Sequence, residues 1–344
     1  MSNPIVRDPR IDPRIKALFA ELPDGGARRV EERDLLIAAM RRYAESPRVP
    51  TFATILAKQD FEALASSSGL AITTRTVTSD PDGNTINLQV IRPEGTTGNL
   101  PCVYYIHGGG MAAMSCYDPS YSAWGRMIAH QGAVVVMVDF RNAAVPSSVP
   151  ETAPYPAGLN DCLSGLAWVR DNTGELGIDA SRVVVSGDSG GGNLALAMAL
   201  KLKRIDGLEA IRGLYLLCPY LRGEWADAEG SSVRTNNGIL IDMVNDNGPL
   251  AYGIEAFRQG DPLAWPGFAT VADLEGLPPV KININECDPL VDDGTDLYRK
   301  LLEAGVSARC RIATGTIHAT EPFVAPCPDI SRDLARDIVA FARE

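Results

Sequence analysis

A glycine-rich turn carries the residue best suited to covalent chemistry. Residues 187–191 read Gly-Asp-Ser-Gly-Gly and fit the pattern G-x-S-x-G, between an apolar run and an alanine- and leucine-rich run. In this pattern a sharp strand-to-helix turn exposes a nucleophilic serine, here Ser189 beside Asp188. Gly187 and Gly191 lie two positions on either side, where a larger side chain would collide. The start of the following helix directs N–H groups toward negative charge that develops beside Ser189.

The same letters also fit a rival motif. Residues 190–195 match G-x-G-x-x-A, a fingerprint of dinucleotide sites. Such a site requires an acid at the end of the next strand, about 20 residues further on, but that strand ends in Cys218-Pro219. No P-loop pattern G-x-x-x-x-G-K-[ST] occurs in the sequence. We therefore expect no nucleotide cofactor. A nucleotide-dependent oxidoreductase stays an alternative, which a test of NAD or NADP binding would decide.

A second glycine run lies upstream of the serine. His107 is followed by Gly108, Gly109 and Gly110, immediately after an expected strand. Glycines let backbone N–H groups approach a substrate oxygen closely, as an oxyanion hole requires. We expect Gly109 and Gly110 to form this hole together with the N–H of Gly190, and Gly108 to shape the turn.

The serine needs a base, and the chain has three histidines. His107 is tied to the glycine run and is expected to anchor its backbone by hydrogen bonds. His130 lies near the end of a helical segment and is expected to be a surface or packing residue. His318 follows the last expected strand, where the fold brings a base to the nucleophile. We expect His318 to be the base.

The acid that orients this base is expected between serine and histidine in chain order, after a strand. The stretch 279–294 offers four acids in quick succession. Asp288 is our choice, because Pro289 fixes the backbone just after it, and Glu286 is the alternative. Asp292 and Asp293 are interpreted as the solvated start of a helix.

Neither a catalytic metal nor a disulfide framework is expected. Three histidines without an H-E-x-x-H motif leave a catalytic metal without ligands. The seven cysteines are spread singly with no C-x-x-C pair, which indicates reduced thiols. Cys287, next to Asp288, is interpreted as a small buried hydrophobic residue.

The elements that must position these residues alternate between strand-like and helix-like segments, which is typical of an α/β fold. The first two expected strands alternate like an exposed antiparallel edge, whereas the later ones read as strands of a mostly parallel sheet buried on both faces by helices. A helix is expected over 156–172. The expected strands are Ala71–Ser79, Asn84–Pro93, Cys102–His107, Ala133–Phe140, Arg182–Gly187, Gly213–Cys218, Pro279–Ile284 and Ala308–Ala313.

Two regions depart from this alternation. Residues 1–70 are charged and helix-like from about 27 to 65, and residues 222–260 are rich in Gly, Asp and Asn. We expect 71–344 to form the catalytic domain, with 1–70 as a helical cap over the carboxyl edge of its sheet. The stretch 222–260 is a candidate cap insertion, although both regions also fit surface decoration.

Overall composition indicates which classes of partner are not expected, such as nucleic acid and membranes. The 344 residues carry a net charge of −11, which disfavours nucleic acid and anionic membrane surfaces. A hydrophobic content of 45% indicates a globular core, and no apolar run reaches the length of a membrane helix. No secretory signal is recognised, so a cytoplasmic location is expected. A small-molecule ligand is expected instead, and homo-oligomerisation is left open.

The motifs HGGGM at 107–111 and GDSGGGN at 187–193, DPL at 288–290 followed by acids, and a late histidine resemble the hormone-sensitive lipase family of α/β-hydrolases. The resemblance runs over nearly the whole chain. It implies a central eight-stranded sheet, a cap of N-terminal helices, and hydrolysis of carboxylic esters by Ser189, His318 and Asp288 without a cofactor. Lactones and amides use the same groups, and a non-catalytic ligand-binding protein on this scaffold is the alternative from another class.

Overall fold

One eight-stranded sheet runs through the protein, in the order β1-β2-β4-β3-β5-β6-β7-β8. The computed structural model describes residues 3–23, 29–45, 51–225 and 228–344. β2 pairs antiparallel with both β1 and β4, and all later neighbours pair in parallel. The strands are β1 (Leu70–Thr78), β2 (Thr85–Pro93), β3 (Leu100–Ile106), β4 (Val134–Asp139), β5 (Ile178–Asp188), β6 (Gly213–Leu217), β7 (Val280–Cys287) and β8 (Ala308–Ile317).

All eight expected strands are confirmed, and so is the mostly parallel sheet. One expectation about burial is wrong. β8 was expected to be buried on both faces, but it is the last strand of the sheet and most of its residues before Thr316 are partly or fully exposed. β8 also continues to Ile317, four residues beyond the expected end, so His318 follows the strand directly.

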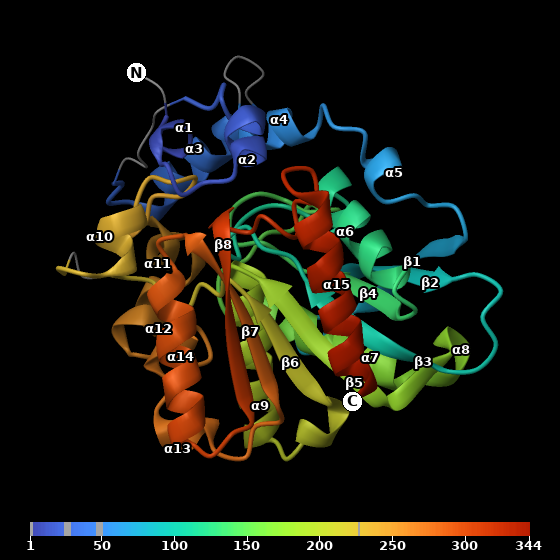
Figure 1. Cartoon of the computed structure of the whole chain (residues 1–344). Helices are drawn as coiled ribbons and strands as arrows, with labels where there is room; N and C mark the ends of the chain where they lie inside the picture. The colour runs from blue at the N-terminus through green and yellow to red at the C-terminus, as the bar shows by residue number, and fades with distance from the viewer. Residues whose placement is uncertain (1–2, 24–28, 46–50, 226–227) are drawn as a thin grey trace.

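Side-chain alternation along the strands builds a hydrophobic core on each face of the sheet. Tyr104 and Ile106 of β3 pack into one core, and Val103 and Tyr105 pack into the other. Helices α7, α9 and α14 cover the first face, whereas α6 and α15 cover the second (Figure 1). These helices are α6 (Pro119–Ala129), α7 (Ala157–Asp171), α9 (Gly190–Arg204), α14 (Val291–Glu303) and α15 (Pro328–Arg343).

The described residues before β1 form five helices, most of them short. Figure 1 shows α1 to α4 grouped at the top of the molecule, above the sheet. The expected helix-like stretch 27–65 holds three of the five, and its residues 27–28 and 46–50 lie outside the described residues. The five helices are α1 (Pro4–Arg7), α2 (Pro13–Leu18), α3 (Arg33–Ala44), α4 (Phe52–Leu56) and α5 (Phe61–Leu64).

The sequence interpretation missed α1 and α2, although both carry local start signals. Asn3 and Asp12 cap these helices by accepting hydrogen bonds from the backbone, and a proline occupies the first turn of each. Such a capping residue followed by proline is a helix start. The charged and proline-rich composition concealed this signal.

The described residues of the stretch 222–260 form three short helices among loops, α10 (Ser232–Asn236), α11 (Asn247–Tyr252) and α12 (Ile254–Arg258). It contacts the N-terminal region through polar bonds. Arg10 donates to Oδ1 of Asn236 at 2.9 Å, and Arg33 of α3 donates to the carbonyl of Ala251 at 3.2 Å. The two regions that departed from the α/β alternation therefore lie against each other.

The remaining short elements connect the main ones. They are α8 (Thr173–Leu176), η1 (Leu208–Ala210), η2 (Pro266–Phe268) and α13 (Val271–Leu274). In the described part of the chain, no helix combines the length and apolar character needed to cross a bilayer.

Candidate active site

Ser189 occupies the sharp turn between β5 and α9. Its φ of 53° and ψ of −117° lie in a region that side chains rarely adopt. Three backbone bonds hold it there: its N–H donates to Leu217 at 2.9 Å, and its carbonyl accepts from Asn193 at 3.1 Å and Tyr220 at 3.0 Å. The end of β6 and the loop after it thus stabilise a strained serine, which is what the G-x-S-x-G pattern requires.

Close packing of the backbone around this turn requires glycine at positions 187 and 191. A Cβ on Gly187 would overlap the carbonyl of Gly191, and a Cβ on Gly191 would overlap the carbonyls of Ile106 and His107. Only glycine lets this turn fit so closely against the end of β3.

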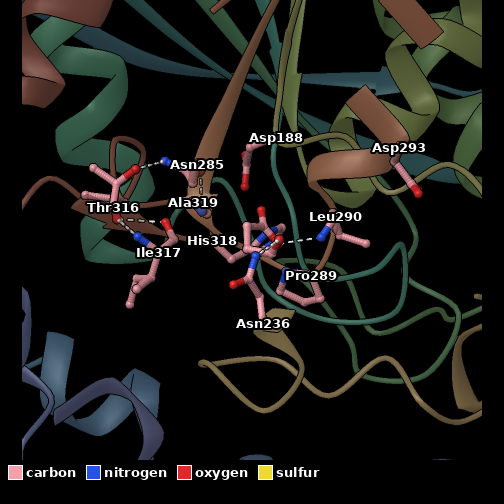
Figure 2. Close-up of polar contacts among 12 residues, drawn as sticks. Asp188, Asn236, Asn285, Pro289, Leu290, Asp293, Thr316, Ile317, His318 and Ala319 are labelled. Atoms are coloured by element: carbon pink, nitrogen blue, oxygen red, sulfur yellow. Dashed lines mark hydrogen bonds and ion pairs between the residues drawn. The ribbon is translucent and has the colours of Figure 1, made fainter. Parts of the chain in front are cut away.

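His318 and Asp288 form a hydrogen-bonded pair beside this turn. Nδ1 of His318 lies 2.7 Å from Oδ2 of Asp288, and both residues are buried. The other carboxylate oxygen accepts from the N–H of Leu290 at 2.9 Å, and Asn236 donates to the Asp288 carbonyl at 2.9 Å (Figure 2). Burial lowers the pKa of His318, but the charges of Asp288 and Cys218 and their hydrogen bonds to the ring together outweigh burial and place this pKa well above its usual range.

The loop that carries His318 is anchored by a buried polar network. The side chain of Asn285 accepts from the N–H of Ala319 at 3.2 Å and donates to Thr316 at 2.8 Å (Figure 2). Asn285 and Asn283 each donate to the fully buried carboxylate of Glu321 at 2.9 Å. These bonds fix the backbone on both sides of His318, so its ring orientation is set by β7 and β8.

The glycine run after β3 lies against the turn that carries Ser189. Gly109 and Gly110 have φ values of 94° and 64°, which favour glycine. The Gly109 carbonyl accepts from Ala112 and Ala113, both at 3.1 Å. A Cβ on Gly190 would lie 2.6 Å from the backbone nitrogen of Met111 and 2.9 Å from Cα of Gly110, so the two glycine segments are in close contact.

The buried carboxylate of Asp188, the residue before Ser189, accepts hydrogen bonds from two tyrosines. Tyr105 and Tyr121 donate to its two oxygens at 2.7 Å and 2.8 Å. The hydroxyl of Tyr121 also accepts from the N–H of Gly108 at 2.8 Å. Burial raises the pKa of Asp188 even though both phenols donate to it.

Ser189 and His318 line the same cavity of about 280 Å³. Gly109 and Gly110 line it as well, and apolar side chains such as Leu240 and Phe323 form much of the rest. Phe52 and Leu240 also border an outer cavity of about 1150 Å³, which lies among the N-terminal helices. Because Ser189 and His318 each follow a parallel strand, the inner cavity lies at the carboxyl edge of the sheet, where α/β folds bind ligands.

The alternatives for base and acid lie elsewhere. Nδ1 of His107 lies 2.9 Å from the Gly108 carbonyl, so this ring bonds to the glycine loop backbone as expected. His130 is exposed, with Nε2 2.8 Å from the Ser66 carbonyl. Glu286 accepts from the N–H of Gly315 at 2.8 Å. Of the two acids considered, Asp288 contacts His318.

One expectation about the acids is wrong. Asp292 and Asp293 do lie in the first turn of α14, but Asp293 is fully buried rather than solvated. Its carboxylate accepts from the N–H groups of Leu221 and Arg222 and from the indole of Trp225, and Figure 2 shows it pointing away from His318. Burial raises the pKa of Asp293 to about 6. This acid ties the loop after β6 to α14.

Several residues of the site had no signal in the sequence. Tyr121 comes from α6 and Cys218 from the end of β6, and neither belongs to a motif that predicts a contact with the glycine turns or with His318. Sulfur of Cys218 and the ligand atoms of Asp288 and His318 lie within 4.8 Å of one another. Cys287 is buried, as expected, and all seven cysteines are free thiols.

Comparison with known proteins places the chain among hydrolases. The family model described as alpha/beta hydrolase fold matches residues 103–321. Carboxylesterase NlhH of Mycobacterium tuberculosis strain H37Rv is 34% identical over 268 residues, which cover 76% of this chain and 80% of that protein. An arylesterase of Saccharolobus solfataricus is 31% identical over 237 residues, which cover 67% of this chain and 72% of the arylesterase.

Solved structures agree with these sequence matches. Esterase Est22 superposes with a TM-score of 0.93 at 53% identity, and the match covers 99% of this chain and 100% of Est22. Brefeldin A esterase, described as a bacterial homologue of human hormone-sensitive lipase, superposes with a TM-score of 0.82 at 32% identity. That match covers 98% of this chain and 94% of the esterase. The resemblance drawn from the sequence motifs is confirmed.

Proposed function

Because the chain belongs to the α/β-hydrolase family, we propose that it is a carboxylesterase that cleaves small to medium esters through a covalent acyl-enzyme. The observation that carries this proposal is the shared cavity of Ser189 and His318, in which Asp288 binds the ring of His318 at 2.7 Å. A serine hydrolase needs these three groups: a nucleophile, a base and an acid that orients the base.

In the first step His318 accepts the hydroxyl proton of Ser189 through Nε2 while the Ser189 oxygen attacks the ester carbonyl. The Nδ1–H of His318 donates to Asp288, which holds this tautomer and stabilises the imidazolium without taking its proton. The carbonyl π electrons move to oxygen, and the resulting oxyanion accepts hydrogen bonds from the N–H groups of Gly109, Gly110 and Gly190. The imidazolium then protonates the leaving alkoxide as the bond to it breaks.

In the second step water replaces the alcohol. His318 accepts a proton from water, the hydroxide oxygen attacks the acyl carbon, and the same three N–H groups stabilise the second oxyanion. The tetrahedral intermediate collapses, Ser189 regains its proton from His318, and the carboxylic acid leaves. No metal ion or organic cofactor takes part in either step.

The substrate limits follow from the cavities. At about 280 Å³ the inner cavity is at the lower end of the range for ligand pockets, so it holds a small group next to Ser189. The helices before residue 70 supply Phe52, and the stretch 222–260 supplies Leu240, Ile241 and Met243. These two segments therefore act as a cap that selects which acyl and alcohol groups fit.

The test is hydrolysis of p-nitrophenyl esters of increasing acyl length by the wild type and by Ser189→Ala. One structure of the similar esterase Est22 is described with p-nitrophenol, which makes these esters a sound choice. We expect turnover by the wild type and a fall in kcat of about a thousandfold or more in the variant. Ser181→Ala, at an exposed serine near the start of β5, the strand that leads to Ser189, should keep full activity. A wild type inert on every ester would contradict the proposal.

A further inference from the structure

A buried thiol lies against the His318–Asp288 pair. Cys218 is 1% exposed, and its sulfur and the nearest ligand atoms of His318 and Asp288 all lie within 4.8 Å of one another. The position is well defined, because the N–H of Cys218 donates to the Asn283 carbonyl at 2.7 Å, and its φ of 33° bends the chain at the end of β6. The esterase chemistry above gives this thiol no task.

The three side chains offer the ligand types of a zinc site. Thiolate sulfur, imidazole nitrogen and carboxylate oxygen bind Zn²⁺ at about 2.3, 2.0 and 2.1 Å, so in tetrahedral geometry these ligand atoms lie about 3.3 to 3.6 Å apart. The three ligand atoms lie within 4.8 Å of one another, so small shifts bring them to these spacings: the sulfur moves closer by about 1 Å at most, and Nδ1 of His318 and Oδ2 of Asp288, now 2.7 Å apart, separate by about 0.6 Å if both bind the ion. Three protein ligands leave a fourth position for water, as in open zinc sites.

We propose that Cys218, Asp288 and His318 form an inhibitory site for a thiol-seeking divalent cation of the Zn²⁺ type. The ion reaches the site from the inner cavity, because His318 lines that cavity and remains 5% exposed. Binding forms one bond from the metal to each ligand atom, and the thiol of Cys218 gives up its proton to solvent. No oxidation or reduction occurs.

A bound metal inhibits because it changes which nitrogen of the His318 ring carries a proton. This argument rests on the proposed function. If the metal binds Nδ1 of His318, the ring keeps its proton on Nε2 and cannot accept the proton of Ser189. If the metal binds Nε2, the base itself is occupied. In both cases Asp288 no longer holds the working tautomer, so the acyl-enzyme cannot form.

Binding is tested first by a readout that does not depend on activity. Co²⁺ replaces Zn²⁺ in such sites, and a thiolate bound to Co²⁺ gives a charge-transfer absorption band. We expect this band on adding Co²⁺ to the reduced wild type, and its loss in Cys218→Ser and in His318→Ala. The control is Cys310→Ser, a partly exposed thiol on the edge strand β8, which should keep the band. A band that survives in Cys218→Ser, or disappears in Cys310→Ser, overturns the proposal.

Inhibition is tested next with Zn²⁺ on ester hydrolysis, scaled to the uninhibited rate of each variant. Loss of one ligand should raise the half-inhibitory concentration in Cys218→Ser by about tenfold or more, since even changes to groups that only hydrogen-bond to metal ligands cost about 10- to 100-fold in metal affinity. Equal inhibition of the wild type and Cys218→Ser, or none of either, would refute the site. Ser189→Ala separates the two proposals, because it abolishes hydrolysis but keeps all three ligands and therefore the Co²⁺ band. If Cys218→Ser unfolds, Cys218→Ala is held to the same expectations.

Discussion

The hydroxyl of Tyr121 donates to Oδ2 of Asp188 at 2.8 Å, in a fully buried position next to the turn that carries Ser189. The same hydroxyl accepts from the N–H of Gly108 at 2.8 Å. One phenol on α6 therefore connects the residue before Ser189 with Gly108, the first glycine of the run 108–110. Each of these glycine-rich segments could adopt many conformations alone, and the Tyr121 hydroxyl fixes their positions relative to each other.

Tyr121→Phe should weaken the proposed oxyanion hole. It leaves the N–H of Gly108 without its acceptor, so the loop that carries Gly109 and Gly110 is less firmly held. We expect kcat to fall by about tenfold or more with KM little changed, because the lost stabilisation acts on the transition state. The affinity for a trifluoromethyl ketone inhibitor, which forms an oxyanion with Ser189, should fall in parallel.

Tyr105→Phe is the matched control. It also removes one phenol from Asp188, but Tyr105 has no bond to the glycine loop. We expect a distinctly smaller effect on the ketone affinity. If both variants lose the same affinity, Tyr121 acts only through the charge of Asp188, and the role in positioning the loop is wrong.

The sequence predicted the residues that belong to compact motifs. Ser189 and the glycines around it form an unbroken pattern, because the turn itself imposes their spacing. The strands were found from local patterns as well, since the inner strands are continuous apolar runs and the first two alternate between polar and apolar residues. His318 and Asp288 could be proposed because each follows a strand on the carboxyl edge of the sheet.

What escaped prediction depends on tertiary contacts. Tyr121 meets Asp188 only because α6 packs on one face of the sheet, and no local pattern in α6 indicates this. Asp293 was interpreted as solvated, since an acid in the first turn of a helix usually is. Its burial results from the loop after β6, which covers it and supplies donors from Leu221 and Trp225.

Asp288→Asn should shift the pH dependence of hydrolysis. The base works only when His318 is unprotonated, so activity falls as the pH drops through the pKa of His318. Asp288 raises that pKa, so the acid limb of kcat/KM in the wild type should lie above the ordinary histidine value of about 6.5. Removing the charge should move this limb to lower pH and cut kcat by about 10⁴-fold, since the histidine tautomer is lost. An acid limb unchanged in the variant would contradict the assignment of Asp288.

Gly190→Ala should damage catalysis more than folding. The new Cβ would lie 2.6 Å from the backbone nitrogen of Met111 and 2.9 Å from Cα of Gly110, so the two glycine segments must separate. We expect a loss of about 100-fold in kcat, comparable to the loss of one oxyanion donor. Gly192→Ala is the control, because its Cβ would meet Pro219 at 3.0 Å, away from Gly109 and Gly110. Comparable kcat losses in both variants would point to a disturbed helix start.

Leu240→Ala should change substrate choice. Leu240 borders both the inner and the outer cavity, so a smaller side chain widens the connection between them. We expect the ratio of kcat/KM for a p-nitrophenyl ester of a long acid to that of the acetate to rise. Val244→Ala, at a residue of the same loop that is 58% exposed, should leave this ratio unchanged. A ratio that does not respond to Leu240→Ala would exclude Leu240 from substrate selection.

Asp293→Asn should lower stability. The carboxylate accepts from the N–H of Leu221 at 2.7 Å and the indole of Trp225 at 2.8 Å, and an amide cannot accept through both of its polar atoms. One buried donor is left unpaired, so we expect the free energy of unfolding at pH 7 to fall by about 1 to 3 kcal/mol in a denaturant titration. Asp296→Asn on the same helix is the control. Its carboxylate is 43% exposed, so the change should stay within about 0.5 kcal/mol.

The pH dependence of this loss gives a second check. Burial raises the pKa of Asp293 from 3.8 to about 6, so between these values the folded protein binds a proton that the unfolded chain has released. The resulting stabilisation is fully present below pH 3.8 and is lost as the pH rises through 6. Asparagine does not titrate, so the stability difference between wild type and Asp293→Asn should be larger at pH 5 than at pH 7. A difference that shrinks toward pH 5 would mean that Asp293 is stabilised as an anion in the folded protein, against the effect of its burial.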